Sequence, residues 1–347
     1  MSAVPPARQP YALLSEQAAA RAGGQVLLQS RLKTVARRLG FGEIKRERML
    51  LVCQELVTNQ MKYARGTGLV QIWEQRSPEP ALDLFAMDFG PGIADLNQAL
   101  ADGHTTSGTL GKGLGTVRRL ADDSDFYSVP ATQAAGTPWQ GTAAWARFRP
   151  GDNGQDEPGP AFGRYLRALH DAPHNGDCAD LAVDRHGLRW VHMDGLGHGV
   201  EAATAVAGRC RPGEPGDSPA EVLHRLSRDL SGSRGAVGIV GEVAAAQRSV
   251  RVCGVGDMNA WVVSEGERRG LEMAPGILGH DHRSCEELRL DLPPHALVIT
   301  ASDGIRRNWS LASFPGLWRR HPQLLALVLG QVLGRSNDDK SLLVIRL

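Results

Sequence analysis

The run RPGDNGQDEPGPAFG, residues 149–163, constrains the fold more than any other stretch of the sequence. It is rich in glycine, proline and acidic residues and has no hydrophobic periodicity, which is typical of a linker between folded parts. A chain of 347 residues is also long enough for two domains, since single domains usually span roughly 100–200 residues. We therefore predict an N-terminal extension over residues 1–20 and two domains, residues 21–148 and 164–347.

The composition is that of an ordinary globular protein, with 42% hydrophobic and 22% charged residues. The 39 Lys and Arg residues nearly balance the 38 Asp and Glu residues, so we expect neither nucleic acid nor an anionic membrane as a partner. No apolar run approaches the roughly 18 residues of a membrane span, and early prolines interrupt the stretch that a signal peptide needs. Five scattered cysteines without a CxxC pair predict reduced thiols. We expect a cytoplasmic protein.

Hydrophobic spacing predicts two helices and then two paired strands in the first half. The strands are VQIWE, residues 70–74, and ALDLFAMDF, residues 81–89, which alternate in polarity. The helices follow from apolar residues three and four positions apart, which share one helical face. These residues are Leu28, Leu32, Val35 and Leu39, before Gly40, in the first helix, and Met49, Val52, Cys53 and Leu56 in the second, which begins near Ile44.

The second half is rich in β-type runs, so we predict a sheet-dominated domain with helices packed against it. Its first two strands are residues 180–184 and 188–194, and its last strand, SLLVIRL, ends the chain. Helices are predicted over residues 200–210 and 219–230, the latter capped by Asp217 or Ser218.

Three motifs of the first half can serve a nucleotide. ELVTN places Glu55 and Asn59 four residues apart on the second helix, where they share a face and can orient a water and a metal-bound phosphate. A solvated helix face explains that pair more simply. In DFGPGI, Asp88 can accept a hydrogen bond from an exocyclic amine such as that of adenine, beside Gly90 and Gly92. A plain turn is an equally good explanation of that motif.

The third motif is SGTLGKGLGTVRRLADD, residues 107–123. Gly111, Gly113 and Gly115 lead directly into a predicted helix, whose free amides can bind an anion, and Lys112 adds a positive charge. The motif does not follow a strand, so it is not the dinucleotide fingerprint, and it is not a P-loop.

In this order, the three motifs resemble those of the Bergerat-fold (GHKL) ATPases over residues 20–148. The switch protein kinases that phosphorylate serine in STAS-type anti-sigma antagonists are the most similar group. The resemblance implies an α/β sandwich that binds ATP with Mg²⁺. Lys112 departs from the family, which usually has an apolar residue there, so this glycine-rich lid is expected to hold phosphate differently. The implied catalytic residue is Glu55, and the implied ATP-binding residues are Asn59, Asp88, Gly90, Gly92, Gly111, Lys112, Gly113, Gly115 and Thr142.

Carboxylates of the second half recur at the ends of predicted strands. Asp194 and Asp303 are each followed by glycine, Asp177 lies in NGDCAD, and Asp338 precedes the last strand. Such acids can converge at one rim of a sheet, where oxygen ligands suit Mg²⁺ or Mn²⁺. Each Asp-Gly pair alone is better explained by a turn.

As a series, GDCAD, MDGLGHG, SDGI and DDKSLLVIRL resemble the motifs of SpoIIE-type phosphatases, a branch of the metal-dependent 2C-type serine/threonine protein phosphatases, over residues 160–347. The resemblance implies a second α/β sandwich with two Mn²⁺ or Mg²⁺ ions. Asp194 would bridge both ions in the catalytic centre, and the Gly195 carbonyl would join one. The remaining implied ligands are Asp303 and Asp338 for the other ion, and Asp177 through water or a third ion, with Asp339 behind them and His198 structural.

The sequence thus predicts an α/β protein that acts on a phosphorylated STAS-type anti-sigma antagonist in partner-switching signalling of the stressosome kind. In the alternative, the ATP domain is a non-catalytic, anti-sigma-like binding module attached to the phosphatase. A metal-dependent nuclease is disfavoured by the neutral charge balance. The sequence leaves the oligomeric state open, a homodimer included.

Overall fold

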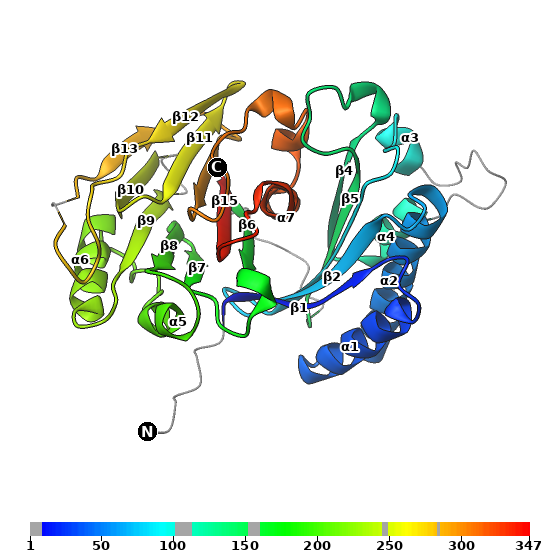
Figure 1. Cartoon of the computed structure of the whole chain (residues 1–347), viewed down its shortest axis with the longest axis horizontal. Helices are drawn as coiled ribbons and strands as arrows, with labels where there is room; N and C mark the ends of the chain where they lie inside the picture. The colour runs from blue at the N-terminus through cyan, green and yellow to red at the C-terminus, as the bar shows by residue number, and fades with distance from the viewer. Residues whose placement is uncertain (1–8, 101–112, 152–159, 245–248, 283–284) are drawn as a thin grey trace. The chain divides into compact units, whose positions relative to one another are not determined.

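The computed structural model describes residues 9–100, 113–151, 160–244, 249–282 and 285–347 (Figure 1). The chain forms two compact units. The N-terminal unit comprises Ala12–Gln155 together with Ala312–Val328, and the remaining residues form the C-terminal unit. Both units are mixtures of helices and sheets, which confirms the α/β fold class.

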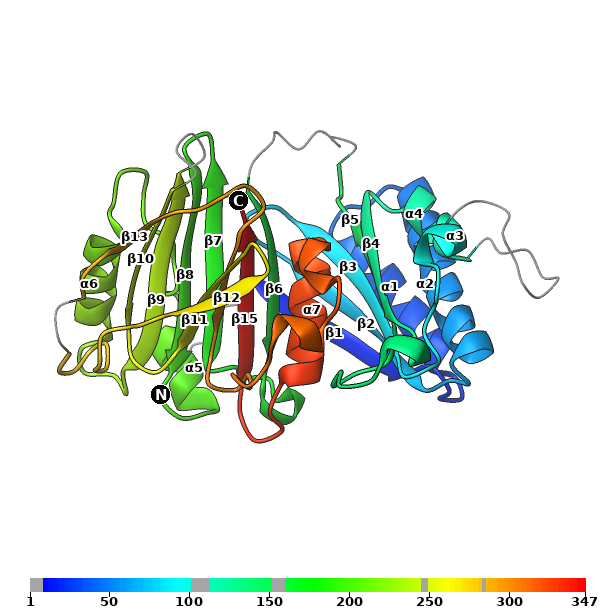
Figure 2. The same ribbon diagram turned by 90° about the horizontal axis from the view of Figure 1, so that it is seen from above.

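The N-terminal unit is built on a five-stranded sheet of order β1-β2-β3-β5-β4, in which β2, β3, β5 and β4 pair antiparallel. Helices α1, α2 and α4 lie along one face of this sheet (Figure 2). The strands are β1 (Tyr11–Ala18), β2 (Gly68–Gln75), β3 (Ala81–Asp88), β4 (Asp123–Val129) and β5 (Gly141–Phe148), and the helices are α1 (Gly24–Arg38), α2 (Glu43–Tyr63), α3 (Leu96–Leu100) and α4 (Gly113–Leu120).

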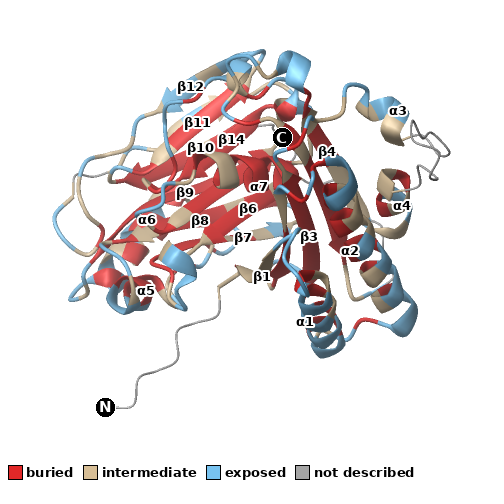
Figure 3. Cartoon of the chain, turned by 45° about the vertical axis from the view of Figure 1, so that its right-hand side comes forward, coloured by how far each residue is buried: buried red, intermediate tan, exposed pale blue. Residues whose placement is uncertain are grey.

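The helical stripes predicted from the sequence form the core of this unit. Leu28, Leu32 and Val35 of α1 pack with Met49 and Val52 of α2 against the sheet, and all are buried. The outward faces of the same helices are exposed (Figure 3). Apolar spacing of three and four residues therefore predicted both helices correctly, because only one face of each is covered.

A segment distant in sequence covers buried polar groups of the same sheet. Arg147 of β5 forms a two-pronged ion pair with Asp83 of β3, both contacts 2.7 Å long, and also donates to Gln323 at 3.3 Å. The Trp145 ring stacks on His321 with 4.4 Å between centroids. Residues 312–328, which the sequence assigned to the C-terminal domain, thus pack with the N-terminal sheet.

The C-terminal unit contains two five-stranded sheets, of order β13-β10-β9-β8-β7 and β12-β11-β14-β15-β6. Helices α5 and α6 pack on the first sheet. The strands are β6 (Ala161–Arg167), β7 (Asp177–Asp184), β8 (Gly187–Gly195), β9 (Ala236–Ala244), β10 (Ser249–Val255), β11 (Asn259–Ser264), β12 (Glu267–Leu271), β13 (Leu288–Asp291), β14 (Leu297–Ala301) and β15 (Lys340–Arg346), and the helices are α5 (Val200–Val206), α6 (Pro219–Leu230) and α7 (Pro322–Leu333), whose first residues belong to the N-terminal unit.

His192 shows how the two sheets meet. Its ring, on β8, lies between the hydroxyls of Thr300 on β14 and Ser341 on β15, at 2.8 and 2.7 Å. Burial lowers the pKa of His192 to about 3, so the ring is neutral and uses one nitrogen as donor and the other as acceptor. The sheets therefore pack face to face, as a sandwich requires.

The local sequence predicted the start of α6 correctly, but it misplaced the end of α5 and the end of the linker. Ser218 caps α6 in a full capping box with Glu221, one of the two caps predicted. Helix α5 ends at Val206, short of the predicted residue 210. Ala161–Gly163, assigned to the linker, form the start of β6 and pair with the last strand. Residues 152–159 of that linker lie outside the described residues.

The expectation of five reduced cysteines was wrong for two of them. Cys253 and Cys285 are joined by a disulfide, with 6.0 Å between their Cα atoms. The pairing of β10 with β13 brings the two segments together, and composition alone cannot show such a pairing. Cys53, Cys178 and Cys210 are free and buried. Across the described residues, no helix is long and apolar enough to cross a membrane.

Candidate functional site

Asp88 ends β3 with its side chain held by two backbone amides. Its Oδ1 accepts hydrogen bonds from the N–H groups of Gly90 and Thr142, at 2.9 and 3.1 Å. Burial raises the pKa of Asp88, and these two hydrogen bonds oppose that rise. Neither bond uses Oδ2, so this oxygen can accept from a ligand such as an amino group.

Two glycines allow the chain to close around Asp88. Gly141 has φ +142° and its Cβ, if present, would stand 2.1 Å from the Asp88 carbonyl oxygen. Gly92 has φ +70°, and a Cβ there would stand 2.4 Å from the Val129 carbonyl oxygen. No other residue fits either position, because both the conformation and the space exclude a side chain. The backbone around Asp88 is therefore bare and tightly turned.

Helix α2 brings the other nucleotide motifs to this turn. Gly90 lies against Ala64, which follows α2, at 2.8 Å from where its Cβ would be. Asn59 of α2 lies against Gly113, the first residue of α4, again 2.8 Å from a hypothetical Cβ. Glu55 is partly exposed one turn earlier on α2. The end of α2 thus contacts both the Asp88 turn and the start of α4.

In the C-terminal unit, Asp177 and Asp194 face each other across β7 and β8. Asp177 is buried, and its Oδ2 has no hydrogen-bond partner among the described residues. Burial raises the pKa of Asp177, while hydrogen bonds from Ser341 and Ser302 oppose the rise. An oxygen that is buried and unpaired is costly unless a ligand satisfies it.

The negative charges of this cluster act on one another. Burial raises the pKa of Asp194, and the charges of Asp177, Asp303 and Asp338 raise it further. Burial likewise raises the pKa of Asp303, followed by the charges of Asp338 and Asp257. Five carboxylates from five separate segments are therefore close enough to repel, and a cation would stabilise them all in the ionised form.

Asp339 plays a different part from its neighbour Asp338. Its Oδ1 accepts from the backbone N–H of Leu169 and its Oδ2 from that of Gly176, both at 2.7 Å. Both oxygens of this buried carboxylate are thus committed to the segment that leads into β7. Asp339 therefore supports the loop that carries Asp177.

No family model matches the chain. One curated relative is the serine/threonine-protein kinase RsbT of Bacillus subtilis (strain 168), to which the N-terminal part is 39% identical over 98 residues, 28% of this chain and 73% of the relative. Through this part, the chain belongs to the RsbT family. The N-terminal half of the chain, which contains this part, is called the RsbT-like half below.

The solved structures that resemble part of the chain include the following two. A chain from a structure of the bacterial stressosome is 25% identical and covers 54% of this chain and 99% of its own length, with a TM-score of 0.48. RsbX in complex with magnesium is 18% identical and covers 55% of this chain and 97% of its own length, with a TM-score of 0.47.

The RsbT-like half brings most of its predicted residues together. Asp88, Gly90, Gly92 and Thr142 form one turn, while Asn59 meets Gly113 at the start of α4. Gly115 is buried within α4. Gly111 and Lys112 lie outside the described residues.

Sequence reasoning overlooked Asp257 in the C-terminal half. It follows β10 in the run GVGD, so it stands at a strand end like Asp194 and Asp303. Its charge raises the pKa of Asp303, which places it at the same rim. The shared position at a strand end was the signal that could have found it.

The carboxylate cluster fits a hard divalent cation by its donor chemistry. Its donors are oxygens alone, Asp177 contributes an unpaired buried oxygen, and the charges repel without a counter-ion. As the described side chains stand, no group of three or more His, Cys, Asp or Glu is gathered closely enough to hold an ion. Side-chain rotations would therefore have to accompany metal binding.

Gly195 and His198 belong to the loop that follows Asp194. The Gly195 N–H donates to the Gly176 carbonyl at 3.0 Å, and a Cβ on Gly195 would stand 2.7 Å from the Ala202 carbonyl oxygen. Gly195 therefore lets α5 approach the end of β8. His198 is exposed. That the Gly195 carbonyl binds a metal stays a prediction.

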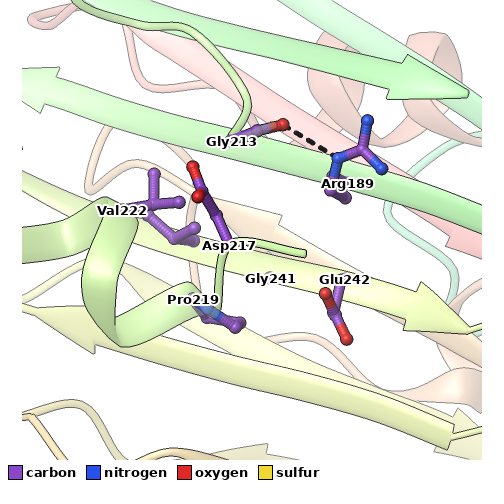
Figure 4. Close-up of a pocket in the computed structure, with 8 residues that line it drawn as sticks. Arg189, Gly213, Asp217, Pro219, Val222, Gly241 and Glu242 are labelled. Atoms are coloured by element: carbon purple, nitrogen blue, oxygen red, sulfur yellow. Dashed lines mark hydrogen bonds between the residues drawn. The ribbon is translucent and has the colours of Figure 1, made fainter. Parts of the chain in front are cut away.

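A surface pocket at the other end of β8 is too small to be the site. Arg189, Asp217 and Glu242 line it, and Arg189 donates to the Gly213 carbonyl at 2.8 Å (Figure 4). Its volume of about 10 Å³ is enough for roughly one water molecule. Arg189 lies near the start of β8, whereas Asp194 lies near its other end, so the pocket and the carboxylate rim are separate.

Proposed function

We propose that the chain is a metal-dependent protein serine/threonine phosphatase joined to an ATP-binding, serine-kinase-like domain. Its substrate would be a phosphorylated STAS-type anti-sigma antagonist in a partner-switching system in the cytoplasm. The observation that carries the phosphatase assignment is the convergence of Asp177, Asp194, Asp303 and Asp338 at one rim. Burial raises the pKa values of Asp177, Asp194 and Asp303, and neighbouring carboxylates raise those of Asp194 and Asp303 further. Such a cluster is stable in ionised form only with cations.

In this proposal each carboxylate has its own role in metal binding, which depends on its position. Asp194, central to the mutual repulsion, would bridge two Mg²⁺ or Mn²⁺ ions, with Asp303 and Asp338 on one of them and Asp177 acting through water. Bound ions of this kind lower the pKa of a water molecule and offset the charge of a transferred phosphoryl group. The glycines after Asp194 leave bare backbone where the phosphoprotein must approach.

The RsbT-like half would bind ATP through Asp88 and the bare backbone around it. The free Oδ2 of Asp88 would accept from the adenine amine, while the amides at the start of α4 and the Asn59 side chain would face phosphate and Mg²⁺. Glu55, one turn before Asn59, would orient or deprotonate the acceptor serine. Membership of a family named for serine/threonine kinase activity supports this role.

Hydrolysis of a phosphoserine protein, and of p-nitrophenyl phosphate, tests the phosphatase. We expect turnover that depends on added Mn²⁺ or Mg²⁺ and stops in EDTA. Turnover that persists in EDTA would refute the metal-dependent mechanism. Mapping phosphosites on proteins retained by the chain, with and without metal, would identify the partner.

Transfer of radiolabelled phosphate from ATP tests the kinase-like half. Glu55→Ala should keep ATP binding and slow transfer by about 10²–10⁴, the usual contribution of a general base. A mutant as fast as wild type would make Glu55 an ordinary helix-surface residue. Tight partner binding without any transfer by the wild-type protein would favour the alternative of an anti-sigma-like binding module.

A further inference from the structure

Arg234 lies in the connection between α6 and β9, at the same end of the sheet as Asp194. β9 begins at Ala236, which pairs with Gly195. The backbone N–H of Leu196 also donates to the carbonyl of Gly235, at 3.2 Å. The residue before Gly235 is therefore held beside the loop that follows Asp194.

The Arg234 guanidinium lies against the bare backbone of that loop. A Cβ on Gly197 would stand only 3.1 Å from Arg234 Nη1. Gly197 also has φ +83°, a conformation that glycine adopts without strain. The absence of a side chain at Gly197 thus leaves room for a guanidinium three residues after Asp194.

Glu201, on α5, is the acidic partner of Arg234, through Nη2 and Oε2. The Arg234 side chain is 52% exposed and that of Glu201 is 65% exposed. An ion pair this open to water contributes little to stability. A more highly charged anion can therefore displace Glu201 without a large loss of folding free energy.

A phosphate dianion approaching Asp194 meets a rim of carboxylates that repels it. Bound cations would engage some of its oxygens, and the others would need donors from the protein. The planar guanidinium of arginine can offer two parallel N–H groups to two phosphate oxygens. Arg307 and Arg335 act electrostatically on Asp303, whereas Arg234 stands at the loop that follows Asp194.

We propose that Arg234 binds the phosphate of the phosphoserine substrate, and that Glu201 holds the guanidinium in place until the phosphate replaces it. This inference rests on the proposed phosphatase function. It assigns to Arg234 the selection of a phosphate dianion over other anions. It also explains why an exposed ion pair is placed beside a glycine loop.

The test compares Arg234→Gln and Arg234→Lys with wild type, using a phosphoserine peptide and a titration of Mn²⁺. Arg234→Gln should raise KM roughly ten- to hundred-fold, the range for losing a hydrogen bond between charged groups. Arg234→Lys should recover part of that loss, because charge remains but the two-pronged geometry does not. The Mn²⁺ concentration for half-maximal activity should stay unchanged, since Arg234 is no metal ligand.

Two further variants separate substrate binding from loop support. Glu201→Gln frees Arg234, so KM should stay the same or fall, whereas a purely structural ion pair would make this variant as poor as Arg234→Gln. Arg228→Gln removes an exposed arginine from the last turn of the nearby α6 and should leave KM unchanged. Melting curves for all variants exclude unfolding as the cause.

Calorimetry with inorganic phosphate and Mg²⁺ gives a second result that needs no turnover. Phosphate binding that is weaker in Arg234→Gln than in wild type supports the assignment. Equal phosphate binding together with an unchanged KM overturns it. If wild type binds phosphate through Arg234 but hydrolyses nothing, the phosphatase proposal fails and the anion site stands.

Discussion

Asp88 and Asp194 both lie at the end of a strand, with a glycine one or two residues further on, yet their surroundings differ in kind. The Oδ1 of Asp88 is satisfied by two backbone amides, and burial is the one cause that raises its pKa. Asp194 stands among other carboxylates, whose charges add to the effect of burial. Asp88 thus has one carboxylate oxygen satisfied by the backbone, whereas the Asp194 carboxylate faces further negative charges.

The difference shows that the location of an acidic residue at a strand end does not by itself determine its function. What decides the function is whether the nearest groups donate hydrogen bonds or carry negative charge. In our proposal, one chain therefore uses the same local motif to recognise an amine in one unit and to bind metal ions in the other.

Replacing Asp194 should have the largest effect on activity. Asp194→Asn removes a charge and one of the oxygens that two ions would share, so the transferred phosphoryl group loses several kcal/mol of stabilisation. We expect metal-dependent hydrolysis to fall by about 10²–10⁴, since about 1.4 kcal/mol corresponds to a tenfold change in rate. A metal titration of turnover, beside a melting curve, measures this. A folded and fully active mutant would remove Asp194 from the centre.

Metal should also stabilise the C-terminal unit. At a concentration 100 times its Kd, an ion that binds only the folded state adds about 2.7 kcal/mol. For a unit of this size that corresponds to roughly 5–10 °C in Tm. Differential scanning calorimetry with Mg²⁺ and with EDTA measures the shift, and Asp194→Asn is the control in which it should largely vanish.

The pH dependence of the same measurement has a defined sign. The folded-state pKa of Asp194 is raised, so the folded protein keeps a proton that the unfolded chain loses, and stability falls as pH rises. Between pH 7 and 8.5, His192 is neutral in the folded state and largely neutral in the unfolded one. In EDTA, Tm should therefore fall across this window, and Mg²⁺ should flatten the fall. Parallel curves with and without Mg²⁺ would contradict the charge argument.

Asp88→Asn tests the role of the carboxylate in the N-terminal unit. The Asn amide oxygen can still accept from Gly90 and Thr142, so the turn should survive. Its amide N–H₂ would then face the adenine amine, donor against donor. We expect ATP affinity to fall by about 1.5–3 kcal/mol, the range for a hydrogen bond to a charged group. Calorimetry on the whole chain measures it, and unchanged affinity would show that Asp88 does not contact adenine.

Much of this arrangement could be predicted because its signals are local. A few adjacent residues are enough to predict each of three features: the apolar stripe through Met49 and Val52, the Ser218 cap and the acids at strand ends. The parts that could not be predicted depend on distant pairings. Neither the cover of Trp145 by His321 nor the Cys253–Cys285 disulfide has a signature in composition or spacing.

Asp338 and Asp339 provide the smallest and most selective test, because adjacent carboxylates should fail in different ways. Asp339 accepts from Leu169 and Gly176 through separate oxygens, so Asp339→Asn replaces one acceptor by a donor that faces a backbone N–H. One buried amide left unpaired costs roughly 1–2 kcal/mol, and we expect a lower Tm with nearly wild-type metal dependence. Asp338→Asn should do the reverse and weaken metal dependence, with an unchanged Tm in EDTA. Equal effects of the two substitutions on metal titration would show that both residues are ligands, and the division between support and ligand would be wrong.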